Sequence, residues 1–269
     1  MHLKRWLTGL ISAPILIFLI GFSPRWVFYL FLFLVSIAGL TEFYRLTAFR
    51  LPGRVRWSIY LLTFLLFVSI YQRQVLLTPV IIILWAFAPM TICMLMYSSV
   101  SKQWTTEIGK AVLGPIYVGL PLAMLLIIDR YPGGNGNIWI FFLLAVIFAA
   151  DTGAFYCGRS FGKHKLYERI SPGKTWEGAI GGLLSSLLAA FLFMRIVALH
   201  KVDLGILILV AALSIAGQIG DLAESMLKRN SEVKDSGRLL PGHGGILDRI
   251  DGLLFAVPML YVYLFFYIS

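Results

Sequence analysis

Nine apolar segments, each close to the length of a membrane-spanning helix, follow one another along this chain. A helix needs about 20 mostly apolar residues, at a rise of about 1.5 Å per residue, to cross the hydrocarbon core. The segments are Trp6–Phe22, Trp26–Phe43, Trp57–Tyr71, Val75–Tyr97, Ala111–Ile128, Ile138–Cys157, Gly178–Leu199, Leu204–Ile219 and Ile250–Ile268. Since 59% of the residues are hydrophobic and only 13% are charged, too little polar surface exists to cover a soluble globule. We expect an all-α, polytopic integral membrane protein with about nine transmembrane helices.

The positive residues are distributed unevenly among the connections. The N-terminus and the even-numbered loops hold 18 of the 23 Lys and Arg residues. This bias predicts a cytoplasmic N-terminus and an external C-terminus, in a multi-pass protein of the cell inner membrane. The formal net charge is +10, and this bias accounts for about half of it. The remaining positive charge is concentrated in the sixth and eighth loops and suits an anionic headgroup or a polyphosphate. No nucleic-acid-binding motif is present, so no nucleic-acid partner is expected.

No linker or soluble domain separates the spans, so residues 1–269 are predicted to form a single membrane domain. Residues 1–137 are mainly scaffold helices, whereas residues 138–269 carry the unusual polar residues and are the predicted catalytic part. Glu42 and Arg45, three residues apart at the end of the second segment, indicate an ion pair on one helical face.

The segment 221–252 holds six carboxylates, five Lys or Arg residues and five glycines beside two apolar spans. Such groups are costly near hydrocarbon, so their density indicates a polar site at the membrane surface. Four of them share one helical face through i, i+3, i+4 and i+7 spacing: Asp221, Glu224, Ser225 and Lys228. An ordinary helix end, with Lys228 paired to one of these acids, is the alternative. Asp248 and Asp251 repeat the i, i+3 spacing at the entry to the last helix.

If these two helices are neighbours, their carboxylates converge and require a cation. Oxygen ligands without convergent His or Cys residues point to Mg²⁺. Asp151, directly after the apolar run IWIFFLLAVIFAA, needs a cation, a hydrogen-bond donor or water, or else makes a polar contact between helices. Nearby positive residues suit a polyphosphate: Lys228, Arg229, Lys234, Arg238 and Arg249. Acids for a metal and bases for phosphate indicate phosphoryl chemistry.

Two glycine-bearing stretches complete the polar inventory. Pro241–Gly245 permits tight turns, and within it His243 is a general base, a hydrogen-bond donor or a fastener of the loop. The sixth loop has Ser171–Thr175 before a helix start; this is not a Walker A motif, but helix-end amides with Lys174 as a point charge suit an anion.

A dozen of these residues, at the same spacings, resemble the signature of the phosphatidate cytidylyltransferase, or CDP-diacylglycerol synthase, family. They are Ser225, Lys228, Arg229, Lys234, Asp235, Gly237, His243, Gly244, Gly245, Asp248, Arg249 and Asp251. The stretch from Asp151 through Ser171, Lys174 and Gly178 is also similar to that family. The first half of the chain is similar only in being hydrophobic and multi-spanning.

The resemblance implies a nucleotidyltransferase of phospholipid biosynthesis that joins CTP and phosphatidic acid, with Mg²⁺, to give CDP-diacylglycerol and pyrophosphate. The active site is then on the cytoplasmic side of the bilayer. Asp221 and Asp248 are the hypothesised primary metal ligands and, with Lys228 and Arg229, the catalytic residues. Glu224, Asp251 and Asp151 hold a second cation, for which a monovalent ion is an option, or support the first. Expected substrate-binding residues are Ser171, Lys174, Ser225, Lys234, Asp235, His243 and Arg249. A homodimer is compatible with the sequence, but no motif indicates one.

Two other functions remain open at this point. A CTP-dependent lipid kinase needs the same metal and nucleotide site but passes on the terminal phosphate. An ion-coupled transporter would bind its coupling cation at Asp151 and Asp221. The charged loop from Lys228 to Arg249 has no evident purpose in transport.

Overall fold

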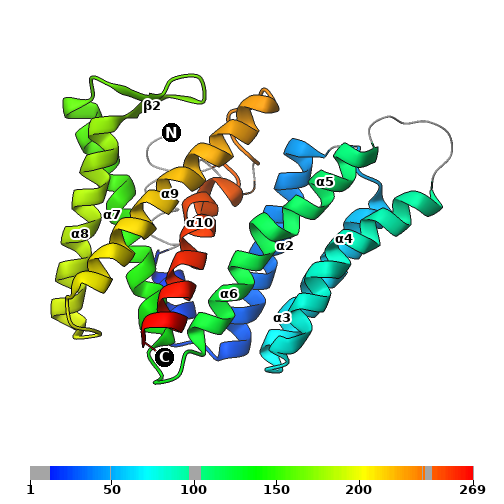
Figure 1. Ribbon diagram of the computed structural model, residues 1–269, viewed down its shortest axis with the longest axis horizontal. Helices are drawn as coiled ribbons and strands as arrows, with labels where there is room; N and C mark the ends of the chain where they lie inside the picture. The colour runs from blue at the N-terminus through cyan, green and yellow to red at the C-terminus, as the bar shows by residue number, and fades with distance from the viewer. Residues whose placement is uncertain (1–12, 49, 97–103, 238, 240–243, 269) are drawn as a thin grey trace. The chain divides into compact units, whose positions relative to one another are not determined.

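The computed structural model describes residues 13–48, 50–96, 104–237, 239 and 244–268 (Figure 1). Within these residues, eight helices are long and apolar enough to cross a membrane, and they match the second to ninth predicted segments in order. The expected all-α, polytopic membrane architecture is confirmed at this level. Residues 6–12 of the first predicted segment, Trp6–Phe22, lie outside the described residues, and residues 13–21 of it are helical. The total number of spans and their orientation stay predictions.

The chain divides into two compact units, one made of Met1–Ile127 with Asp235–Leu247 and the other of Ile128–Lys234 with Asp248–Ser269. The helices of the first unit are α2 (Arg25–Thr47), α3 (Gly53–Tyr71), the short 3-10 helix η1 (Val75–Leu77), α4 (Thr78–Leu95), α5 (Trp104–Gly114), the π-helical turn η2 (Pro115–Gly119) and α6 (Leu120–Asp129), which ends in the second unit.

Prolines mark several of the helix boundaries in the first unit. Pro24 and Pro52 precede α2 and α3 with extended backbone angles, and Pro79 stands in the first turn of α4, where its missing N–H costs nothing. Pro115 opens the π-helical turn inside the span Trp104–Asp129, because it cannot donate the regular helical hydrogen bond.

The core of the first unit is apolar, and one buried hydroxyl in it links two helices. Phe43, Ile59 and Trp85 are wholly buried. Tyr44, also buried, donates its hydroxyl to the carbonyl oxygen of Ala111 at 2.8 Å, which joins α2 to α5. Internal pairing of this kind is needed where no water is present.

The second unit contains α7 (Gly136–Phe161), β1 (Lys165–Tyr167), β2 (Ser171–Thr175), α8 (Trp176–Val197), α9 (Leu204–Asn230), α10 (Leu247–Tyr263) from Asp248 onward, and the π-helical η3 (Leu264–Ile268). Helices α7 and α8 lie side by side (Figure 1). Their contact is close because small residues meet: a Cβ on Gly178 would stand 2.9 Å from the carbonyl oxygen of Ala154.

Three elements differ from the sequence prediction in ways that matter for the site. The eighth apolar segment was predicted to end near Ile219, with the polar stripe on the end of the same helix; helix α9 continues to Asn230, beyond the apolar segment, and contains the whole stripe. Helix α10 begins at Leu247, three residues before the predicted span. The sixth loop forms an antiparallel hairpin with Lys165 opposite Thr175 and Tyr167 opposite Ser171, which the prediction of helices alone missed.

Candidate active site

Helices α9 and α10 approach each other closely at the level of their acidic residues. A Cβ on Gly220 of α9 would lie 3.1 Å from the backbone carbon of Asp251 and 3.1 Å from Cα of Gly252 on α10. Only glycine permits this backbone separation without displacing one helix. The carboxylates of the two helices are therefore held in one region.

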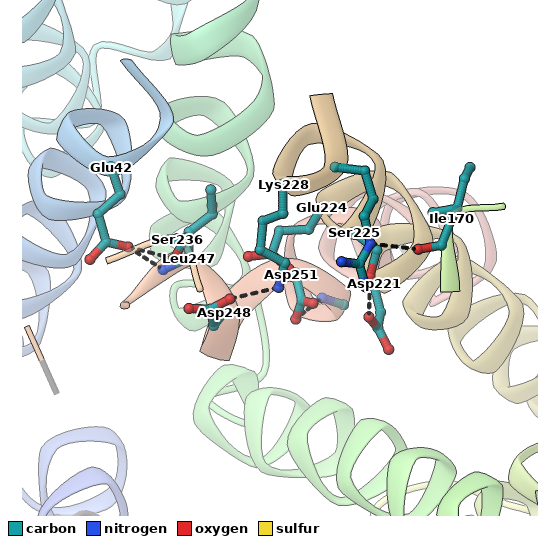
Figure 2. A network of polar contacts seen from close by, with 12 residues as sticks. Glu42, Ile170, Asp221, Glu224, Ser225, Lys228, Ser236, Leu247, Asp248 and Asp251 are labelled. Atoms are coloured by element: carbon teal, nitrogen blue, oxygen red, sulfur yellow. Dashed lines mark hydrogen bonds and ion pairs between the residues drawn. The ribbon is translucent and has the colours of Figure 1, made fainter. Parts of the chain in front are cut away.

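Lys228 connects the two helices through its ammonium group. Its Nζ lies 2.7 Å from Oδ1 of Asp248 and also pairs with the Glu224 carboxylate one turn earlier on α9 (Figure 2). Glu224 is wholly buried, and the side chains of Lys228 and Asp248 are 16% and 7% exposed. The expected local pair of Lys228 with Glu224 on α9 is thus present, and Lys228 also pairs with Asp248 on α10. Because these charges are largely removed from water, each depends on the others for stabilisation.

A second lysine, Lys174, reaches the same stripe from the hairpin. Its Nζ lies 2.8 Å from Oδ2 of Asp221, and the hydroxyl of Ser225 donates to Oδ1 of the same carboxylate at 3.4 Å. The Asp221 side chain is 43% exposed, so it remains accessible to an incoming cation or substrate.

The hairpin that carries Lys174 is fastened at both ends. Thr175 caps α8 by accepting from the backbone N–H of Gly178 at 3.1 Å. Glu177, in the first turn of α8, accepts from the backbone N–H of Lys163 and lies 2.6 Å from Nδ1 of His164. The turn itself is held by Arg229, whose Nε donates to the carbonyl oxygen of Ile170 at 3.2 Å (Figure 2). This bond uses only Nε of Arg229 and does not involve the two terminal guanidinium nitrogens.

Three aspartates from three helices complete the cluster. Asp151 of α7, Asp221 of α9 and Asp251 of α10 lie near enough for their charges to repel one another, and Lys174 and Arg249 lie near enough to Asp151 to attract it. We use the name carboxylate cluster for Asp151, Asp221, Glu224, Asp248 and Asp251. Its five carboxyl groups face three basic groups of the same unit, Lys174, Lys228 and Arg249, so acidic groups outnumber basic ones.

The carboxylate cluster has the chemistry of a site for a hard cation but is not arranged as a closed metal centre. No three His, Cys, Asp or Glu side chains of the described residues are grouped so that they could hold a metal ion. The two predicted primary ligands, Asp221 and Asp248, contact different lysines. Their oxygen donors and the excess of carboxyl groups fit Mg²⁺, and the ligand set stays a prediction.

The other predicted substrate-binding residues are placed less centrally. Ser171 begins β2, and Arg249 is exposed on α10. Lys234 and Asp235 are exposed, and neither forms a hydrogen bond or ion pair with another residue that the structure describes. His243 lies outside the described residues.

Glu42 has a role that the sequence interpretation missed. It does not pair with Arg45; instead, its buried carboxylate accepts hydrogen bonds from Ser236, Ile246 and Leu247, in the loop between α9 and α10. The i, i+3 spacing favoured the local pair, but three donors distant in sequence satisfy the carboxylate in the interior. The uncharged partners gave no charge pattern from which the contact could be predicted.

Comparisons with known proteins identify the family of this chain. Residues 3–267 match the model of the cytidylyltransferase family. The chain is 36% identical to the phosphatidate cytidylyltransferase of Bacillus subtilis over 267 residues, which cover 96% of each protein. It is 42% identical over 177 residues to the phosphatidate cytidylyltransferase of Staphylococcus saprophyticus, with 65% of this chain and 66% of the relative covered. The protein is thus a nucleotidyltransferase built on membrane helices, with a mixed cluster of Lys, Asp and Glu side chains. The chain belongs to the cytidylyltransferase family.

Proposed function

We propose that this protein is a phosphatidate cytidylyltransferase, which transfers CMP from CTP to phosphatidic acid and releases pyrophosphate. The observation that carries the proposal is the contact of Lys228 with both Glu224 and Asp248, inside a segment that has the family's spacing. Relatives named for this activity, one of them covered almost from end to end, support the same substrates. They do not favour a lipid kinase or a transporter.

The reaction forms one bond between phosphorus and oxygen and breaks another. An ionised phosphate oxygen of phosphatidic acid attacks the α-phosphorus of CTP, and the bond from that phosphorus to the oxygen bridging to the β-phosphate breaks. The electron pair of the broken bond leaves with pyrophosphate. Because the attacking phosphate is already ionised near neutral pH, no general base is required, and alignment with charge neutralisation supplies the catalysis.

The basic residues hold the substrates in this proposal. Lys174, Lys228 and Arg229 bind the CTP phosphates and stabilise the charge that develops on pyrophosphate, with Lys234 on the same loop side of α9. Arg249 binds the lipid phosphate. Support comes from the two lysine–aspartate pairs, of which Lys174 with Asp221 is the more exposed and so the more accessible to a nucleotide.

Mg²⁺ is the proposed cofactor, with Asp221 and Asp248 as its primary ligands. When bound, the ion supplies positive charge that screens the CTP phosphates from the carboxylates. Glu224, Asp251 and Asp151 hold a second cation or position the first ligands. The surplus of acids over bases in the carboxylate cluster supports this assignment.

The proposed location is the inner membrane, with the active site at its cytoplasmic face. The Lys and Arg bias of the even-numbered loops supports this orientation, and CTP is supplied from the cytoplasm.

The test is an assay of purified protein in detergent micelles with CTP, phosphatidic acid and Mg²⁺. We expect CDP-diacylglycerol and pyrophosphate to appear in equal amounts, and only when all three components are present. A lipid product without pyrophosphate release would overturn the proposal, since it indicates transfer of the terminal phosphate.

A further inference from the structure

Glu42 is a buried carboxylate that accepts hydrogen bonds, among the described residues, from two residues of one loop and from the first residue of α10. Its side chain is in α2 and the residue is only 4% exposed. Oε2 accepts from the Ser236 hydroxyl at 3.1 Å and from the backbone N–H of Leu247 at 2.8 Å (Figure 2). Oε1 accepts from the backbone N–H of Ile246 at 3.1 Å. A carboxylate in the interior is costly unless its oxygens are satisfied, so these bonds hold Glu42 and the loop together.

Two glycines of the loop are packed directly against this carboxylate. The atoms nearest to a Cβ on Gly237 would all belong to Glu42, with Cδ 2.7 Å and Cγ 3.1 Å away. A Cβ on Gly245 would meet the same carboxylate and the hydroxyl of Ser236. Neither glycine has a positive φ, so the need for glycine arises from the approach of Glu42 and not from the backbone conformation. Gly237 and Gly245 therefore leave the space that the Glu42 carboxylate occupies.

The two backbone donors stand at the start of α10. Ile246 directly precedes the helix, and Leu247 is its first residue. The first N–H groups of a helix have no partner within the helix and are usually satisfied by a Ser, Thr, Asp or Asn side chain at the cap. Here Ile246 cannot supply such a group, and the carboxylate of Glu42 does so from α2. The next residue in the chain is Asp248.

We propose that Glu42 is a positioning residue for the cytidylyl-transfer reaction. By capping the start of α10, Glu42 holds the first turn of this helix in place. Asp248 lies in that turn, and Asp251 follows one turn later. Glu42 touches neither substrate; it acts through Ile246 and Leu247. This inference rests on the proposed function for its kinetic consequence, whereas the capping contact itself is testable without any substrate.

The first experiment compares Glu42→Gln with the wild-type protein at saturating phosphatidic acid. The amide keeps one acceptor but turns an NH₂ group toward the N–H donors, so α10 loses its fixed start. We expect kcat to fall about 10- to 100-fold, as for small displacements of reacting groups, while the KM for CTP stays within about 2-fold. Glu107→Gln is the matched control, because Glu107 also lies in a candidate membrane span, Trp104–Asp129, but pairs with Lys110 of its own helix at 3.0 Å. Its kcat should stay within about 2-fold of wild type.

A merely structural role would lower the melting temperature and leave kcat per folded molecule unchanged, and this result would overturn the proposal. Hydrogen exchange gives the readout that needs no activity. The peptide containing Ile246 and Leu247 should exchange faster in Glu42→Gln than in wild type, and unchanged exchange there would also overturn the proposal. If wild type makes no CDP-diacylglycerol but this exchange difference is present, the proposed function fails and the cap stands.

A second pair of variants tests the contact should Glu42→Gln fail to fold. Gly237→Ala should lower kcat because its methyl group collides with Glu42. Glu42→Asp shortens the side chain by one methylene group and makes room for that methyl group, so the double variant should be more active than Gly237→Ala alone. If the losses of kcat in the two single variants were additive in the double variant, residues 42 and 237 would not interact, and this result would contradict the proposal.

Discussion

Lys228 of α9 and Asp248 of α10 form an ion pair of 2.7 Å between two candidate membrane helices. The same ammonium group also pairs with Glu224, which lies one turn earlier on α9. One cation thus stabilises two carboxylates that the structure holds away from water. This arrangement places a lysine beside the proposed metal ligand Asp248, in keeping with its proposed role of neutralising the charge on the leaving pyrophosphate.

Lys228→Met should be among the most damaging substitutions in the chain. It leaves the carboxylates of Glu224 and Asp248 without their shared cation, and the loss of one partner from a buried ion pair costs about 3–5 kcal/mol of unfolding free energy. Thermal unfolding in detergent measures this loss. Lys110→Met is the control, because the more exposed Lys110 pairs only with Glu107. Equal stability of the two variants would contradict the buried role of Lys228.

Lys174→Ala should affect nucleotide use more than stability. Lys174 contacts the half-exposed Asp221 from the hairpin, and the loss of one charged contact to a phosphate corresponds to about a 10- to 100-fold higher CTP requirement or lower turnover. Initial rates over a range of CTP concentrations measure this effect. Lys163→Ala is the matched control from the same loop. A rate curve identical to wild type would remove Lys174 from the site.

Gly220→Ala should separate α9 from α10. Its methyl group would collide with the backbone of Asp251, and overpacking of this kind costs about 1–3 kcal/mol while it displaces the carboxylates. We expect activity to fall about 100-fold, from a shift of about 1 Å. Gly109→Ala, in α5 with nothing within 4 Å of the new methyl group, should leave activity unchanged. Wild-type activity in Gly220→Ala would show that the close approach is not needed.

Asp221→Asn and Asp248→Asn test the metal assignment. Each should abolish most CDP-diacylglycerol formation at ordinary Mg²⁺ concentrations and reduce the rise in melting temperature that Mg²⁺ gives to wild type. Asp203→Asn is a control on the same helix as Asp221, because Asp203 caps the opposite end of α9 by accepting from Ile206 N–H at 2.9 Å. Near-normal product formation by both site variants would remove them as metal ligands.

The sequence predicted most of the helices and the polar stripe but not the contacts that assemble the site. Hydrophobic length located eight spans, and the i, i+4 spacing anticipated the pair of Glu224 with Lys228. The partner of Lys228 on α10 depends on how closely two helices approach, which Gly220 determines and no local pattern reveals.

Glu42 and the hairpin were missed for different physical reasons. The donors to Glu42 stand 194 or more positions further along the chain and carry no charge, so the nearby Arg45 offered the better pattern. The hairpin strands are only three and five residues long, and the second, SPGKT, contains Pro and Gly, which are depleted in strands. Its form is fixed instead by Glu177, Thr175 and Arg229.

The most direct measurement follows the phosphates of CTP through the reaction. Purified protein receives phosphatidic acid and Mg²⁺ with CTP labelled either at the α-phosphate or at the γ-phosphate. Cytidylyl transfer predicts that the α label enters the lipid and that the γ label is released as pyrophosphate. Recovery of the γ label in the lipid, with the α label left in CDP, would contradict the account.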